Sequence, residues 1–64
     1  MTELEEIIAG LKILADHGAT VFCAEHDQIY IHGIRIPFTE EEEKTLDDLG
    51  FFEGSSENSM ERFV

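Results

Sequence analysis

The spacing of apolar residues changes at Gly18, and this change constrains the fold more than any other feature of the sequence. Before Gly18, apolar side chains recur every three or four residues, the period of an amphipathic helix. They are Leu4, Ile7, Ile8, Leu11, Leu14 and Ala15. Thr2 and Glu5 have the spacing of a capping box, so the helix is predicted to begin beside Thr2 and to stop at Gly18. His17 lies in its last turn, where the helix dipole favours a cation.

After Gly18 the apolar residues alternate, as they do in strands. Segments 20–24 and 28–32 flank a polar stretch and predict a hairpin with His26–Asp27 at its tip. In that register one face is apolar and holds Phe22, Ala24, Ile29 and Ile31. The opposite face is semi-polar and holds Val21, Cys23, Tyr30 and His32. Without a cover from this chain, Val21, Cys23 and Tyr30 form a candidate homodimer face, and a strand edge is the other route to a dimer.

The segment that follows the hairpin leads to a second helix. A bulge at Gly33 would return Ile34 and Ile36 to the face of the earlier isoleucines, and Pro37 is expected to end the strand. Thr39 with Glu42 repeats the capping-box spacing. A helix is therefore predicted at about 40–49, closed by Gly50.

Three phenylalanines in the last 14 residues favour a second hairpin with a polar loop, residues 54–59, although this segment could also fray. The predicted fold class is α+β. One small domain, residues 1–64, has the order α-β-β-α-β-β, and the N-terminal helix covers an antiparallel sheet. The expected core residues are Ile8, Leu11, Phe22, Ile29, Ile31 and Leu46.

Acidic residues greatly outnumber basic ones. The chain has 15 Asp and Glu against 4 Lys and Arg, a formal net charge of -11 on 64 residues. So acidic a chain repels nucleic acids, anionic membranes and acidic substrates. The expected partner is a basic protein surface, with no direct binding of nucleic acid or membrane.

The acidic excess is concentrated on the predicted second helix. The helix dipole accounts for part of the run 40–43. The remaining carboxylates fall on neighbouring stripes, with only Lys44 nearby, and we interpret them as candidate partner-binding residues: Glu40, Glu41, Glu43, Asp47 and Asp48. Neighbours on a helix surface are roughly 5–6 Å apart, so this row can imitate a phosphate backbone and occupy the groove of a nucleic-acid-binding protein. A merely solvated helix face is the other interpretation.

Residue types that support catalysis or metal binding are few. Cys23, His26 and His32 are good zinc ligands by type, but their spacing is poor and a fourth ligand is lacking. The clustered carboxylates lack the pattern of an EF-hand and show no partly dry site for acid–base catalysis. We therefore expect no enzyme, no metal and no cofactor. The lone Cys23, the acidic N-terminus and the lack of a long apolar run predict a soluble, cytoplasmic protein.

The second half of the chain resembles small phage and prophage proteins. The resemblance covers residues 27–64. It consists of the segment 27–31, an acidic helix, the segment 49–52, a polar turn, Ser59 and the final residues 63–64. It implies an inhibitor of the anti-CRISPR or DNA-mimic type, which binds without catalysis. The alternative hypothesis is a small structural or regulatory protein that acts through homo-oligomerisation.

Overall fold

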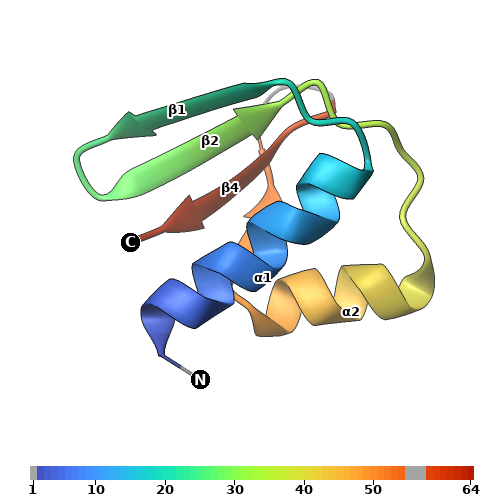
Figure 1. Ribbon diagram of the computed structural model, residues 1–64, viewed down its shortest axis with the longest axis horizontal. Helices are drawn as coiled ribbons and strands as arrows, with labels where there is room; N and C mark the ends of the chain where they lie inside the picture. Colours follow the sequence, from blue (N-terminus) through green and yellow to red (C-terminus); the bar gives the residue numbers. More distant parts are fainter. Residues whose placement is uncertain (1, 55–57) are drawn as a thin grey trace.

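Two helices and four strands follow one another as α-β-β-α-β-β in the computed structural model, which describes residues 2–54 and 58–64 (Figure 1). The elements are α1 (Glu3–Asp16), β1 (Val21–Glu25), β2 (Gln28–His32), α2 (Glu40–Asp48), β3 (Phe51–Glu53) and β4 (Met60–Phe63). The strands form one antiparallel sheet in the order β1-β2-β4-β3. The predicted α+β class and element order are confirmed. Neither helix of the described chain is long and apolar enough to cross a membrane.

The first hairpin has the predicted register. Phe22 pairs with Ile31 and Ala24 pairs with Ile29, while His26 and Asp27 form the turn. His26 has a φ of 50°, a left-handed conformation that a tight two-residue connection requires and that is uncommon for a residue other than glycine. The turn therefore fixes which side chains of β1 and β2 share a face.

The second hairpin also forms, and it places β4 inside the sheet. Phe51 pairs with Arg62 across β3 and β4, and on the other side of β4 Ile31 pairs with Met60. Residues 55–57 of the predicted polar loop lie outside the described residues. The sheet thus joins the two halves of the chain, with β1 and β3 as its edges.

The core lies on one face of this sheet, and both helices contribute to it. Its hydrophobic residues, all less than one tenth exposed, are Leu14, Ile29, Ile31, Ile34, Leu46, Leu49, Phe51 and Met60. The sequence predicted a cover by the first helix together with a buried Leu46, and α2 supplies Leu46 and the adjoining Leu49. Ile29, Ile31 and Leu46 are buried as predicted, and Leu11 is partly buried against the core.

Helix α1 is rotated relative to the predicted orientation. The prediction that Ile8 and Phe22 are buried is wrong, because their side chains are 56% and 57% exposed. A Cβ atom on the buried Gly10 would overlap the ring of Phe51, so the absence of a side chain lets α1 approach β3 closely. This contact turns the Gly10–Leu14 side of α1 toward the core and leaves Ile8 to one side.

The predicted bulge at Gly33 does not form, because the strand ends before it, yet one of the two isoleucines that it was expected to return does reach the core. Strand β2 ends at His32, earlier than Pro37, and Gly33 has a φ of 79°. Ile34 is buried, and its N–H donates to the carbonyl of Asn58 at 3.1 Å. Ile36 is 61% exposed, contrary to the prediction, because residues 33–39 leave the sheet to reach α2 and no strand ladder turns its side chain inward.

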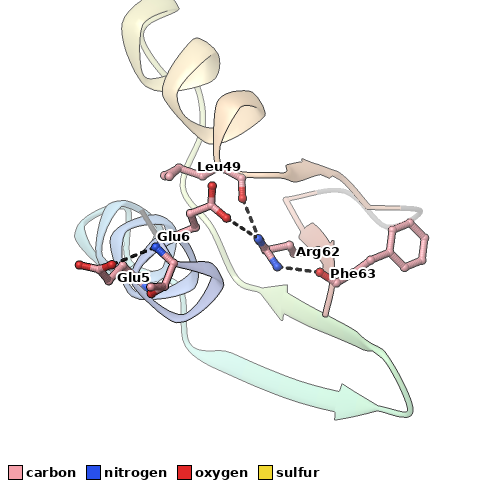
Figure 2. A network of polar contacts seen from close by, with 6 residues as sticks. Glu5, Glu6, Leu49, Arg62 and Phe63 are labelled. Atoms are coloured by element: carbon pink, nitrogen blue, oxygen red, sulfur yellow. Dashed lines mark hydrogen bonds and ion pairs between the residues drawn. The ribbon is translucent and has the colours of Figure 1, made fainter.

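A buried arginine on β4 holds the two helices beside the sheet (Figure 2). Arg62 Nε donates to the carbonyl of Leu49 at 2.8 Å, and Nη1 donates to the carbonyl of Phe63 at 2.7 Å. Nη2 forms an ion pair with Glu6 Oε1 of α1 at 3.3 Å. Since the carbonyl at a helix C-terminus lacks an intrahelical partner, Arg62 satisfies the end of α2 and fixes its position.

Candidate functional site

Helix α2 begins with the predicted capping box. Thr39 Oγ1 accepts a hydrogen bond from the N–H of Glu42 at 3.1 Å, and Glu42 Oε1 accepts one from the N–H of Thr39 at 2.9 Å. Two of the N–H groups that a helix start leaves without partners are thereby satisfied. The local sequence therefore sets where the acidic helix starts.

The other carboxylate oxygen of Glu42 binds His17. His17 Nε2 lies 2.9 Å from Glu42 Oε2, and Nδ1 lies 2.8 Å from the carbonyl oxygen of Arg35. Both neighbours are acceptors, and only an imidazolium donates from both ring nitrogens. The sequence indicated a cationic His17 stabilised by the helix dipole, whereas the structure shows a tertiary contact between the end of α1 and the start of α2.

The contact between His17 and Glu42 shifts the pKa of each side chain in the direction that favours its charged form. The hydrogen bond to Glu42, followed by that to the Arg35 carbonyl, raises the pKa of His17 above 6.5. The hydrogen bond from the Thr39 N–H, followed by that from His17, lowers the pKa of Glu42 below 4.5. Glu42 is thus occupied by the fold and is not available to a partner.

The other acidic side chains of α2 are available. The five predicted partner-binding residues are all exposed, and none of their side chains forms a hydrogen bond or ion pair with another residue of the described chain: Glu40, Glu41, Glu43, Asp47 and Asp48. Lys44 is three or four residues from four of them and is also exposed. A single flexible cation among five carboxylates leaves a strongly negative surface, which we call the α2 acidic surface.

Tertiary packing adds a sixth carboxylate to this surface. A hollow of about 300 Å³ lies between α2 and β3, and Glu43, Asp47 and Glu53 all line it. Its apolar lining includes Phe38 and Phe52. Sequence reasoning missed Glu53, because no spacing in the sequence indicates that β3 lies against this side of α2. A hollow lined by both aromatic side chains and carboxylates suits the aliphatic stem and charged end of a Lys or Arg side chain.

The predicted homodimer face is only partly apolar. Val21 and Cys23 are exposed on β1, but Tyr30 is half-buried and its hydroxyl donates to Gln28 Oε1 at 3.2 Å. Gln28 Nε2 in turn donates to Glu61 Oε1. The structure therefore places Tyr30 in a row of polar side chains that crosses from β2 to β4.

The cysteine and histidines of the first hairpin lie as the register requires. Cys23 pairs with Tyr30, His32 pairs with Val21, and His26 lies in the turn. In the part of the chain that the structure describes, no three His, Cys, Asp or Glu side chains gather closely enough to hold a metal ion. The clustered charges of the site therefore lie on α2 and β3.

Comparisons with protein-family models, with curated proteins and with solved structures found no match to this chain.

Proposed function

We propose that this protein is a non-enzymatic acidic binding protein whose α2 acidic surface occupies a basic surface of another protein. The supporting observation is that five exposed carboxylates of one short helix have no partner within the described chain. The helix start needs only part of this charge, because Glu42 already completes the cap and pairs with His17. The remaining mutual repulsion destabilises the monomer, and a cationic partner would remove it.

The class of partner follows from the charge and its spacing. Carboxylates on adjacent helix turns lie roughly 5–6 Å apart at Cβ, and the surface is long enough to meet several Lys or Arg side chains at once. We propose a nucleic-acid-binding protein as the target, so that the α2 acidic surface displaces its nucleic acid as a phage-type, DNA-mimic inhibitor does. Release of counterions from the two surfaces would then drive binding, as it does for DNA.

The proposed site of action is the cytoplasm. Cys23 is a free thiol on an exposed strand, and a reducing compartment keeps such a thiol from forming disulfides. This proposal does not depend on the identity of the target.

The experiment compares two triple variants of equal charge. One variant neutralises the α2 acidic surface by Glu41→Gln, Glu43→Gln and Asp47→Asn. The matched control neutralises three exposed carboxylates elsewhere by Asp16→Asn, Glu25→Gln and Asp27→Asn. Basic proteins retained by the immobilised wild-type chain from host extract at low salt are identified and purified, and each is titrated with all three chains by calorimetry.

We expect the α2 variant to lose tenfold or more in affinity for a nucleic-acid-binding partner, while the control stays within about threefold. Duplex DNA should compete with the wild-type chain, and the loss should shrink at high salt because exposed charges are screened within about 10 Å at 0.1 M. Lys44→Gln should raise the affinity. Equal losses in the two triple variants, or no loss in the α2 variant, would refute the proposal.

A further inference from the structure

No described part of the chain covers the β1 edge of the sheet, and this edge has few of the features that prevent edge pairing. All five residues of β1 are exposed, and the strand pairs only with β2. Natural edge strands are usually protected by proline, lysine, a bulge or an inward charge. The pairing of β1 runs without interruption from Val21 to Glu25, and Glu25 at its end is the single charged residue. The outward N–H and C=O groups of β1 are therefore available to another strand.

Apolar side chains are concentrated beside this edge. A groove of about 200 Å³ runs between α1 and β1, and its lining includes Leu11, Ala15, Ala19, Val21 and Phe22. None of its lining residues is charged. For a chain of net charge -11, such an uncharged surface is exceptional.

The apolar surface continues along α1. Leu4 and Ile8 precede Leu11 and Ala15 at helical spacing, so they lie on the same side of the helix. Leu4 is 66% exposed and Ile8 is 56% exposed. We call β1, the groove and this stripe of α1 the open edge. Four of the eight large hydrophobic residues that are exposed in the described chain belong to it: Leu4, Ile8, Val21 and Phe22.

We propose that the open edge binds a second copy of this chain, by antiparallel pairing of β1 with the partner's β1 across a twofold axis at Cys23. A cationic partner would find no carboxylate in the groove. Two copies repel one another over most of their surface, but the groove has no charged lining residue and β1 carries only Glu25. Pairing would extend the sheet across both copies and bring their apolar stripes toward one seam, which supplies the buried area that a small domain lacks.

The sequence of β1 is complementary to itself in one register. Full overlap of the two five-residue strands places Cys23 opposite the partner's Cys23 and Phe22 opposite the partner's Ala24. A large ring then lies beside a small side chain on the face where the groove runs. The two Glu25 side chains lie four residues apart along the seam, about 13 Å at ~3.3 Å per residue, which exceeds the screening length of about 8 Å at physiological ionic strength. A register shifted toward the tip would bring them closer.

Sedimentation equilibrium and thiol cross-linking test this pairing. At tens of micromolar we expect a species of twice the 7.3 kDa chain mass. Its fraction should increase with salt, since salt screens the repulsion between two acidic copies. Binding through the α2 acidic surface should weaken with salt, so the two proposals respond in opposite directions and fail independently.

Matched variants locate the interface. Phe22→Lys should shift the equilibrium to monomer, whereas Ile36→Lys, at an equally exposed residue outside the sheet, should leave the dimer intact. A short bismaleimide should join two wild-type chains through Cys23 and should join none in Cys23→Ser. Moving the thiol to position 21 or 25 in that background should give less cross-linking. A strict monomer, a dimer that survives Phe22→Lys, or cross-linking that does not depend on thiol position would overturn the proposal, and the cross-linking result holds even if Phe22→Lys fails to fold.

Discussion

The two edges of the sheet differ in what covers them, although each carries a phenylalanine on the core face. On β3, Phe51 is 2% exposed beneath Gly10 of α1 and beside Leu46 of α2. On β1, Phe22 is 57% exposed. The strand pairings put both rings on the same side of the sheet, but α2 packs against β3 and not against β1. The position of a strand relative to the helices, and not its hydrophobicity, decides whether its ring enters the core.

The side of the molecule that contains β3 also has polar contacts between α1, α2 and β4, and the described β1 side chains make no such contacts. Arg62 joins β4 to the end of α2 and to α1, and His17 joins the end of α1 to Glu42 of α2. Within the described chain, no side chain of β1 makes a hydrogen bond or ion pair. The molecule therefore has one closed side, built on β3 and α2, and one open side, built on β1.

Truncation of the two phenylalanines should give the largest difference between the sides. Phe51→Ala should lower the free energy of unfolding by about 3–5 kcal/mol, because it leaves a cavity in the core. Phe22→Ala should cost less than about 1 kcal/mol in the monomer, since the ring is already in water. Urea denaturation at low micromolar concentration, where self-association is minimal, measures both. Equal costs for the two variants would break the comparison.

Removal of the arginine should have the next largest effect. Arg62→Met keeps much of the side-chain volume but leaves the carbonyls of Leu49 and Phe63 without their donor, which should cost about 2–3 kcal/mol. Glu6→Gln is the matched control. Glu6 is one third exposed, and a neutral acceptor remains, so its cost should stay below about 1 kcal/mol. A larger loss in Glu6→Gln than in Arg62→Met would show that the ion pair, and not the carbonyl contacts, closes this side.

The contact between His17 and Glu42 should give the smallest effect, visible as a dependence on pH. The raised pKa of His17 means that its contribution to stability is complete below pH 6.5 and is lost as the pH rises through the folded-state pKa. The lowered pKa of Glu42 means that its contribution is complete above pH 4.5 and is lost as the pH falls through the folded-state pKa. The denaturation midpoint of wild type should exceed that of His17→Gln most between pH 4.5 and 6.5.

A variant of the carboxylate sharpens this test. Glu42→Gln retains a side chain that can complete the capping box but removes the charge that faces His17. Glu42→Gln should lose the same pH-dependent part of the free energy of unfolding as His17→Gln. The variant that carries both substitutions should lose little more than either one alone. A midpoint difference that does not change with pH in either single variant would mean that this contact does not depend on an imidazolium.

Several local features could be predicted because they depend on residues close in sequence. The two capping boxes at Thr2 and Thr39 form as predicted, since each links residues three positions apart. The register of the first hairpin follows from the two residues at its tip. The exposure of the five α2 carboxylates could also be predicted, because the helix has few apolar residues and most of its surface must therefore face water.

Other features could not be predicted, because they depend on contacts between distant parts of the chain. Gly10 interrupts the apolar stripe of α1 in sequence, yet the lack of a side chain there lets α1 approach Phe51 of β3, since a Cβ atom would overlap the Phe51 ring. That contact rotates α1, buries Leu14 and exposes Ile8. In the same way Glu53 joins the α2 acidic surface only because β3 packs beside α2.

The sequence by itself determined the order of the elements, the helix starts, the pairing of the first hairpin and the strongly negative charge, because caps, tight turns and periodic spacing act over a few residues. Only the tertiary structure decided which edge of the sheet is covered, which side of α1 faces inward and where Arg62 and His17 find their partners. Those outcomes depend on how closely two surfaces can approach and on which polar groups must be satisfied when they do. Neither is a property of any one segment.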